Sequence, residues 1–298
     1  MFSKIKKIII FLLFSIILFI IFKNPTIVIE SVNYSTDIFI KNIITSLFPF
    51  FILADILINY NYIYYLSKIL KFKYSYIILM CIISGLPSNA KFISNLLDRN
   101  EISIKDANIL LSITFFPNPM FVIGTVGTLM LNNTKLGIVL LINLYISNLI
   151  MYLIYYKKLD KKNISFNNNS LNFPNLLKKS ILNNINTLLV ILGTIVIFIL
   201  LSNIIFTYIK VSPLTEGIIT SIFEMTSGIK KISILNLNTN LKYMIISICL
   251  MLSGISIITQ AFSILSNYKL GIKLILRNKL ILILLNFILN YVYIIFLI

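Results

Sequence analysis

The chain has 298 residues, of which 58% are hydrophobic and 12% charged, and its mean hydropathy is +0.97. A soluble domain cannot bury that much apolar surface, so the composition predicts an all-α polytopic membrane protein embedded in a lipid bilayer. The formal net charge is +17, but the 26 basic residues are scattered between apolar segments and do not gather on one face. This distribution argues against nucleic-acid binding and makes the charges a guide to topology.

The residue inventory excludes several kinds of catalytic site. Histidine is absent, and the two cysteines, Cys81 and Cys249, lie within apolar runs. No zinc site, disulfide framework, Ser-His-Asp triad or Cys-His pair can be built from these residues, and we expect no metal and no cofactor. An intramembrane aspartyl protease needs two aspartates on facing helices, and only Asp55 lies within a predicted span. We therefore predict that the protein is not an enzyme.

The chain starts with the basic stretch MFSKIKK and an apolar run over 8–22, with no signal-peptidase-like site after it. We interpret residues 1–36 as an uncleaved N-terminal membrane helix followed by a loop. The next apolar segment covers 37–58 and leads into a basic patch that contains Lys68, Lys71 and Lys73.

Two half-length apolar pieces then flank Ser84-Gly85 and are too short for two crossings, which predicts a hairpin that enters and leaves on one side. The segment 105–130 is long enough to cross but has Pro117-Asn118-Pro119 at its centre. Two prolines there remove backbone donors and predict a broken helix. A full span over 136–156 completes a first repeat over 37–156.

The polar stretch 157–180 is predicted to be a cytoplasmic linker, and 181–298 repeats the plan. It offers a long span over 181–208, a short piece from Ser212, an interrupted span over 241–265 and a last span from Leu280. We expect its interruptions at Ser227-Gly228 and Ser253-Gly254. Three crossings per half give the halves opposite orientations, which predicts an inverted repeat with re-entrant hairpins and broken helices, a pattern of secondary transporters. The positive-inside rule places the N-terminus in the cytoplasm, together with the Lys68 to Lys73 patch, the lysines of the linker and a loop that contains Lys269 to Lys279.

The breaks supply the candidate substrate site, because helix ends free backbone groups and a helix N-terminus attracts anions. The alternative is that Ser and Gly only allow close helix packing, that the prolines make a packing kink, and that Lys91 extends to the headgroups. The predicted substrate-binding residues are Ser84, Gly85, Pro87, Asn89, Lys91, Asn118, Pro119, Ser227, Gly228, Ser253, Gly254 and Gln260.

Glu224 is predicted to be a coupling group or charge partner, because an acid in hydrocarbon is expensive unless it faces a cavity or a partner. Glu216 follows Ser212-Pro213, which predicts a helix N-cap with the acid complementing the dipole. Asp55 lies near the cytoplasmic end of its span, where it can reach water. Gln260, if buried, needs hydrogen-bond partners from the other half or from substrate.

Six motifs in fixed order resemble the sporulation integral membrane protein family of the YlbJ type (stage V sporulation protein V), in the nucleoside-recognition or Gate-domain group. They are LFPFFILADIL, SGLPSNAKFISNLL, the NP of FFPNPMFVIGTVG, LGIVLLINLYISNLI, FEMTSGI and SGISIITQ. The family pattern S-G-x-P-x-x-A-K is met at Ser84 to Lys91, and E-x-x-x-G at Glu224 and Gly228. The chain departs from it with Ser253-Gly254 where Gly-Gly is expected.

The resemblance implies a role in endospore formation, with transport of dipicolinic acid into the forespore across the outer forespore membrane. Two other readings stay open: a nucleoside permease, with amides and an acid binding a ribose or base, and an assembly factor of the spore envelope that transports nothing. The sequence leaves open the oligomeric state, the energy source and the choice between the cell membrane and the outer forespore membrane.

Overall fold

The computed structural model describes residues 2–59, 69, 74–98, 100–160 and 172–297. In these ranges the chain is helical and has no strand, only an isolated bridge between Leu86 and Pro117. The first-half helices are α1 (Phe2–Lys23), α2 (Pro25–Ile38), the π-helical η1 (Phe39–Ile44), α3 (Thr45–Asn59), α5 (Ser75–Ser84), α6 (Ser88–Asp98), α7 (Ile104–Ile113), the π-helical η2 (Phe121–Met130), α8 (Thr134–Tyr155) and the short η3 (Tyr156–Lys158). The second-half helices are α9 (Phe173–Tyr208), α10 (Pro213–Phe223), α11 (Met225–Ser233), α12 (Thr239–Leu252), α13 (Gly254–Ile264) and α14 (Ile272–Leu297).

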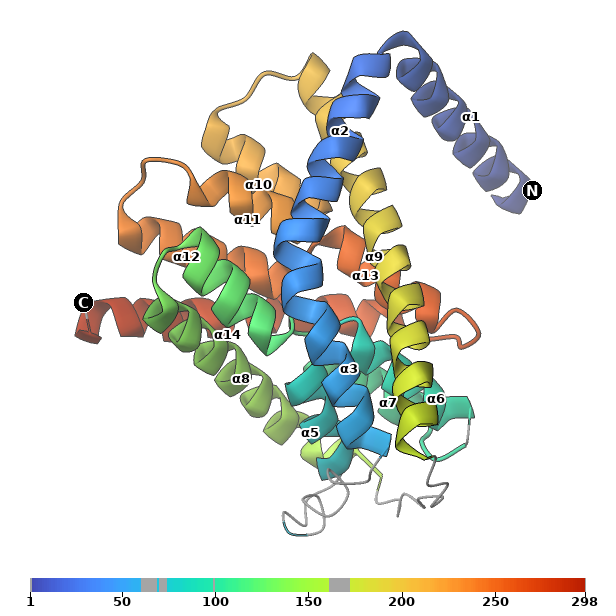
Figure 1. Ribbon diagram of the computed structural model, residues 1–298, viewed down its shortest axis with the longest axis vertical. Helices are drawn as coiled ribbons and strands as arrows, with labels where there is room; N and C mark the ends of the chain where they lie inside the picture. The colour runs from blue at the N-terminus through green and yellow to red at the C-terminus, as the bar shows by residue number, and fades with distance from the viewer. Residues whose placement is uncertain (1, 60–68, 70–73, 99, 161–171, 298) are drawn as a thin grey trace.

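The helices form an all-α membrane protein. Within the described ranges, four spans are long and apolar enough to cross a bilayer: Thr134–Lys158, Phe173–Tyr208, Thr239–Ile264 and Ile272–Phe296. A fifth is possible if Phe14–Lys23 and Pro25–Ile44, which meet at 98°, count as one bent span. The continuous rod of α2, η1 and α3 runs beside α9, while α8, α12 and α14 lie crosswise to them (Figure 1).

Several predicted boundaries are wrong, because apolar periodicity does not mark where a helix starts in polar sequence. The predicted loop before residue 37 is helical from Pro25, and α9 begins at Phe173, inside the predicted linker. The last helix begins at Ile272 and so includes residues that were assigned to a cytoplasmic loop. The patch Lys68, Lys71 and Lys73 lies outside the described residues.

The breaks at Ser84-Gly85, at Pro117-Asn118-Pro119 and at Ser253-Gly254 are confirmed. The predicted break at Ser227-Gly228 is wrong: α10 ends at Phe223 and α11 begins at Met225, so the chain turns at Glu224. Gly228 has another role there. A Cβ on Gly228 would lie 2.2 Å from the Ser221 backbone nitrogen, so its absence lets α11 pack directly against α10.

Two further glycines bring η2 against α8. A Cβ on Gly127 would lie 2.6 Å from the Gly137 Cα, so the backbones of η2 and α8 touch at this point. Close approach through small residues is how membrane helices gain packing energy without a hydrophobic driving force. Gly124, in contrast, faces only the flexible end of Met120.

We predict that Gly228→Ala destabilises the protein by about 2 kcal/mol or more, because an added methyl group would have to force α10 and α11 apart. Gly193→Ala is the control, since Gly193 has no atom within 4 Å of its Cβ position. The melting temperature of each variant in detergent, followed by size-exclusion chromatography of a fluorescent fusion, measures the effect. An unchanged melting temperature for Gly228→Ala would contradict the packing seen here.

Candidate functional site

The two breaks of the first half cross and satisfy each other's backbone. The Leu86 N–H donates to the Phe116 carbonyl at 3.0 Å, and the Asn118 Nδ2 donates to the Ser84 carbonyl at 2.9 Å. The Asn118 Oδ1 accepts from the backbone of Met120 at 2.7 Å. Asn118 therefore ends α5 and caps the start of η2 at the same time, which explains an asparagine between two prolines.

Gly85 and Asn89 hold this crossing together. Gly85 has φ +62° and its Cβ position lies 2.5 Å from the Asn118 Cα, so a side chain fits neither the backbone angle nor the space. The Asn89 Nδ2 donates to the Thr114 carbonyl, and its Oδ1 accepts from the Ala90 N–H at 2.8 Å. Both side-chain groups of Asn89 are thereby occupied within the protein.

Glu224 caps the start of a helix in the second half, as Asn118 does in the first. Its Oε1 accepts from the Thr226 N–H at 3.0 Å and its Oε2 from the Ser227 N–H at 2.6 Å. A buried carboxylate is thus held by the N-terminus of α11, where free N–H groups and the helix dipole favour negative charge. Within the described part of the chain, no lysine or arginine lies within 4.0 Å of it.

The second break of this half is at Ser253, which has φ 60° and is followed by Gly254 at φ +65°. A Cβ on Gly254 would lie 3.0 Å from the Met225 backbone nitrogen. The α12–α13 break therefore lies directly against the turn at Glu224, as the two breaks of the first half lie against each other.

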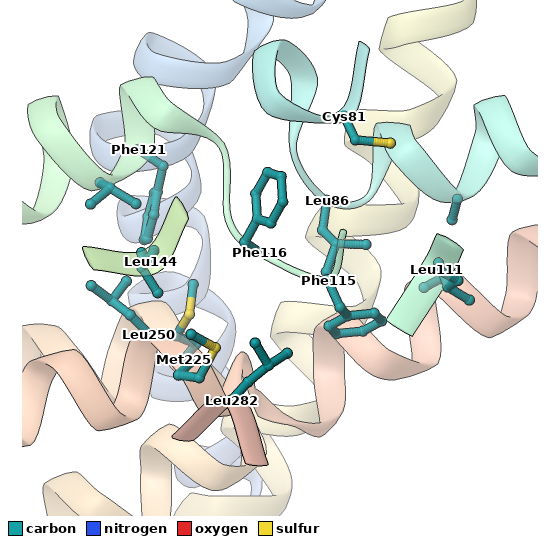
Figure 2. Packing of buried hydrophobic residues seen from close by; sticks show 14 of the residues in the cluster. Cys81, Leu86, Leu111, Phe115, Phe116, Phe121, Leu144, Met225, Leu250 and Leu282 are labelled. Atoms are coloured by element: carbon teal, nitrogen blue, oxygen red, sulfur yellow. The ribbon is translucent and has the colours of Figure 1, made fainter. Parts of the chain in front are cut away.

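A cavity of about 40 Å³ joins the breaks of both halves. Four predicted site residues line it: Pro87, Asn118, Glu224 and Gln260. They are joined by Met225 and Thr226 of α11 and by apolar side chains, among them Leu86, Ile191 and Ile195. Figure 2 shows Leu86 and Phe115 of the first half close to Leu282 of the second, with Met225 and Leu250 beside them.

The other predicted site residues do not line this cavity: Ser84, Gly85, Asn89, Lys91, Pro119, Ser227, Gly228, Ser253 and Gly254. Ser84, Gly85, Pro119, Ser253 and Gly254 lie at the breaks behind it, whereas Asn89 and Lys91 lie within α6, and Ser227 and Gly228 lie within α11. Gln260 is buried, and its Nε2 donates to the Thr194 Oγ1 of α9 at 2.6 Å.

The outlying acids have partners among the described residues. Asp55 accepts from the Asn184 Nδ2 at 3.0 Å, which ties α3 to α9. Glu216 lies in the first turn of α10 after the N-cap Ser212, as predicted, and also binds Lys231 at 2.7 Å.

A row of buried polar residues on α14 is not among the residues predicted from the sequence: Asn278, Lys279, Asn286 and Asn290. Asn278 donates to the Ser112 Oγ of α7 at 2.8 Å, and Asn290 accepts from the Asn143 Nδ2 of α8 at 2.9 Å. The last helix therefore connects the two halves through hydrogen bonds. The spacing of the asparagines could have predicted this row, because residues four or eight positions apart share one helix face.

The chain is similar to the sporulation integral membrane protein YlbJ of Bacillus subtilis. The two are 27% identical over 321 aligned positions, which cover 91% of this chain and 78% of the relative. No family model and no solved structure matches the chain. The similarity supports the family resemblance of the motifs and, with the apolar helices, an integral membrane protein with a role in sporulation.

We predict that Asn118→Ala destabilises the protein by about 2–4 kcal/mol, because it leaves the buried Ser84 carbonyl without its side-chain partner and removes the cap from the Met120 N–H. Asn118→Asp keeps the acceptor but loses the donor to Ser84, so it should be destabilising too. Asn95→Ala, at an exposed position of α6, should change stability by less than about 0.5 kcal/mol. The melting temperatures of the three variants in detergent measure the effect. A decrease for Asn118→Ala no larger than that for Asn95→Ala would show that Asn118 does not stabilise the crossing.

Proposed function

We propose that the protein is a membrane transporter of a small organic anion, with dipicolinate as the substrate, and that it acts in sporulation as a member of the YlbJ-type family. The observation that carries this is the cavity between the breaks. Pro87, Asn118, Glu224 and Gln260 are far apart in the sequence, yet all four line it. Irregular backbone at membrane depth is tolerated where it is buried in protein or lines a cavity, and transporters place substrate at such breaks.

The order of elements supports an inverted repeat of the Gate-domain kind. The rod α2–η1–α3, the pair α5–α6, the broken α7–η2 and α8 correspond in order to α9, α10–α11, the broken α12–α13 and α14. Two halves built alike but inserted in opposite directions give a protein two conformations of similar energy, one open to each side.

The cavity is too small for the substrate in this conformation. A water molecule needs roughly 10–15 Å³ of such space, so about 40 Å³ accommodates water and excludes an aromatic diacid. The structure therefore corresponds to a closed state, and the turns at Pro87 and Glu224 must separate for substrate to enter. Glu224 is next to the space that opens, where it can take up a coupling proton.

A nucleoside is the rival substrate, since the amides of Asn118 and Gln260 and the Glu224 carboxylate are groups that bind a ribose or a base. Uptake of labelled dipicolinate, with labelled uridine in parallel, into vesicles that contain only this protein separates the two. Uptake of uridine alone would show that the substrate is a nucleoside and not an organic anion. Uptake of neither compound would contradict transport and favour an assembly factor.

We predict that Glu224→Gln and Gln260→Ala each lower the initial rate of dipicolinate uptake by about tenfold or more, since the first removes the charge and the titratable carboxyl group of Glu224 and the second removes the amide of Gln260, and both residues line the cavity. Thr259→Ala is the matched control, because Thr259 is exposed and precedes Gln260 on the same helix. Equal rates in all three variants, at equal protein in the vesicles, would exclude this cavity as the substrate site.

A further inference from the structure

Lys279 is a buried lysine on α14 whose role the proposed transport site does not yet include. Its side chain is 4% exposed. The amino group donates to the Ser253 Oγ at 3.0 Å and lies 4.1 Å from the centre of the Phe115 ring. One contact is at the break of the second half and the other is beside the break of the first half, so Lys279 touches both.

Neither contact carries a negative charge. The Ser253 hydroxyl gives its own proton to the Leu250 carbonyl at 3.2 Å, which leaves its oxygen to accept from Lys279. No carboxylate in the described part of the chain lies within 4.0 Å of the Lys279 amino group. A hydroxyl and a ring face replace only part of the hydration that an ammonium loses on burial.

Lys91, the lysine expected from the sequence to bind an anion, is in a different situation. It is only partly buried, so solvent or lipid headgroups can solvate its ammonium group. Of the two lysines beside the breaks, Lys279 is the one that is buried.

Lys279 is also close to the cavity without lining it. Phe115 is two residues from Pro117, which lines the cavity, and Ser253 precedes Gly254, which packs on Met225 of the cavity wall. Since a lysine has a flexible four-carbon stem with three donors, the amino group can turn from the Phe115 ring toward the cavity while α14 stays in place.

We propose that Lys279 and Ser253 form an anion subsite that takes a carboxylate of the substrate when the breaks separate. The inference rests on the proposed function and adds to it the group that selects for negative charge. In the closed state Phe115 and Ser253 hold the amino group. In the substrate-bound state a carboxylate replaces the ring as its partner.

The test compares a charged ligand with a neutral one of the same shape on the full-length protein in detergent. Pyridine-2,6-dicarboxylate and pyridine-2,6-dicarboxamide are titrated by calorimetry into the wild type, Lys279→Met, Lys279→Arg and Lys91→Met. We expect Lys279→Met to weaken dicarboxylate binding by about tenfold or more, as loss of a charge-assisted hydrogen bond does, and to leave dicarboxamide binding unchanged. Lys279→Arg should retain most of the preference for the dicarboxylate, and Lys91→Met all of it.

Lys279→Gln, which keeps a donor to Ser253 without the charge, repeats the measurement if Lys279→Met is not monodisperse. Dicarboxylate binding that is the same in the wild type and in the neutral variants overturns the subsite and leaves the proposed transport of an anion standing. An equal loss for both ligands assigns Lys279 a structural role and also overturns it. A wild type that binds no dicarboxylate overturns the proposed function itself.

Discussion

The structure depends on one constraint: a helix that breaks inside a bilayer frees backbone N–H and C=O groups that lipid cannot satisfy. In the first half the protein meets it by placing two breaks in contact, so that each supplies hydrogen-bond partners for the other. The Leu86 N–H donates to the Phe116 carbonyl, and the Ser84 carbonyl accepts from the Asn118 side chain. Because these partners come from distant parts of the chain, satisfying the backbone also fixes how the helices cross.

This constraint explains why some site residues could be predicted and others could not. Gly85, Pro117 and Pro119 act on their own backbone, and their effect is visible in the sequence without knowledge of any partner. The roles of other predicted site residues depend on which part of the protein packs against them. Gly228 was expected to break a helix but instead makes room for Ser221, and only the packing of α10 on α11 shows the difference.

The last helix shows the limit of reasoning from topology. A lysine next to the end of an apolar run is ordinarily placed in a loop, and the sequence therefore predicts that Lys279 lies in a cytoplasmic loop. The helix begins at Ile272, which moves Lys279 two turns inside it and onto the face that carries Asn286 and Asn290. Helix starts in polar sequence are the least predictable boundaries, and here one such boundary decided whether a charge is at the surface or buried.

The two halves satisfy the constraint with different chemistry. The crossing of the first half uses the neutral amides of Asn89 and Asn118, and its hydrogen bonds do not depend on protonation or on an added charge. The second half uses the Glu224 carboxylate and the Lys279 ammonium, which form no ion pair with each other. A buried charge held only by neutral groups responds strongly to a proton or a counter-ion. For the proposed transport of an anion, the first half is therefore suited to be the fixed support, and the second half to be the part whose turns move.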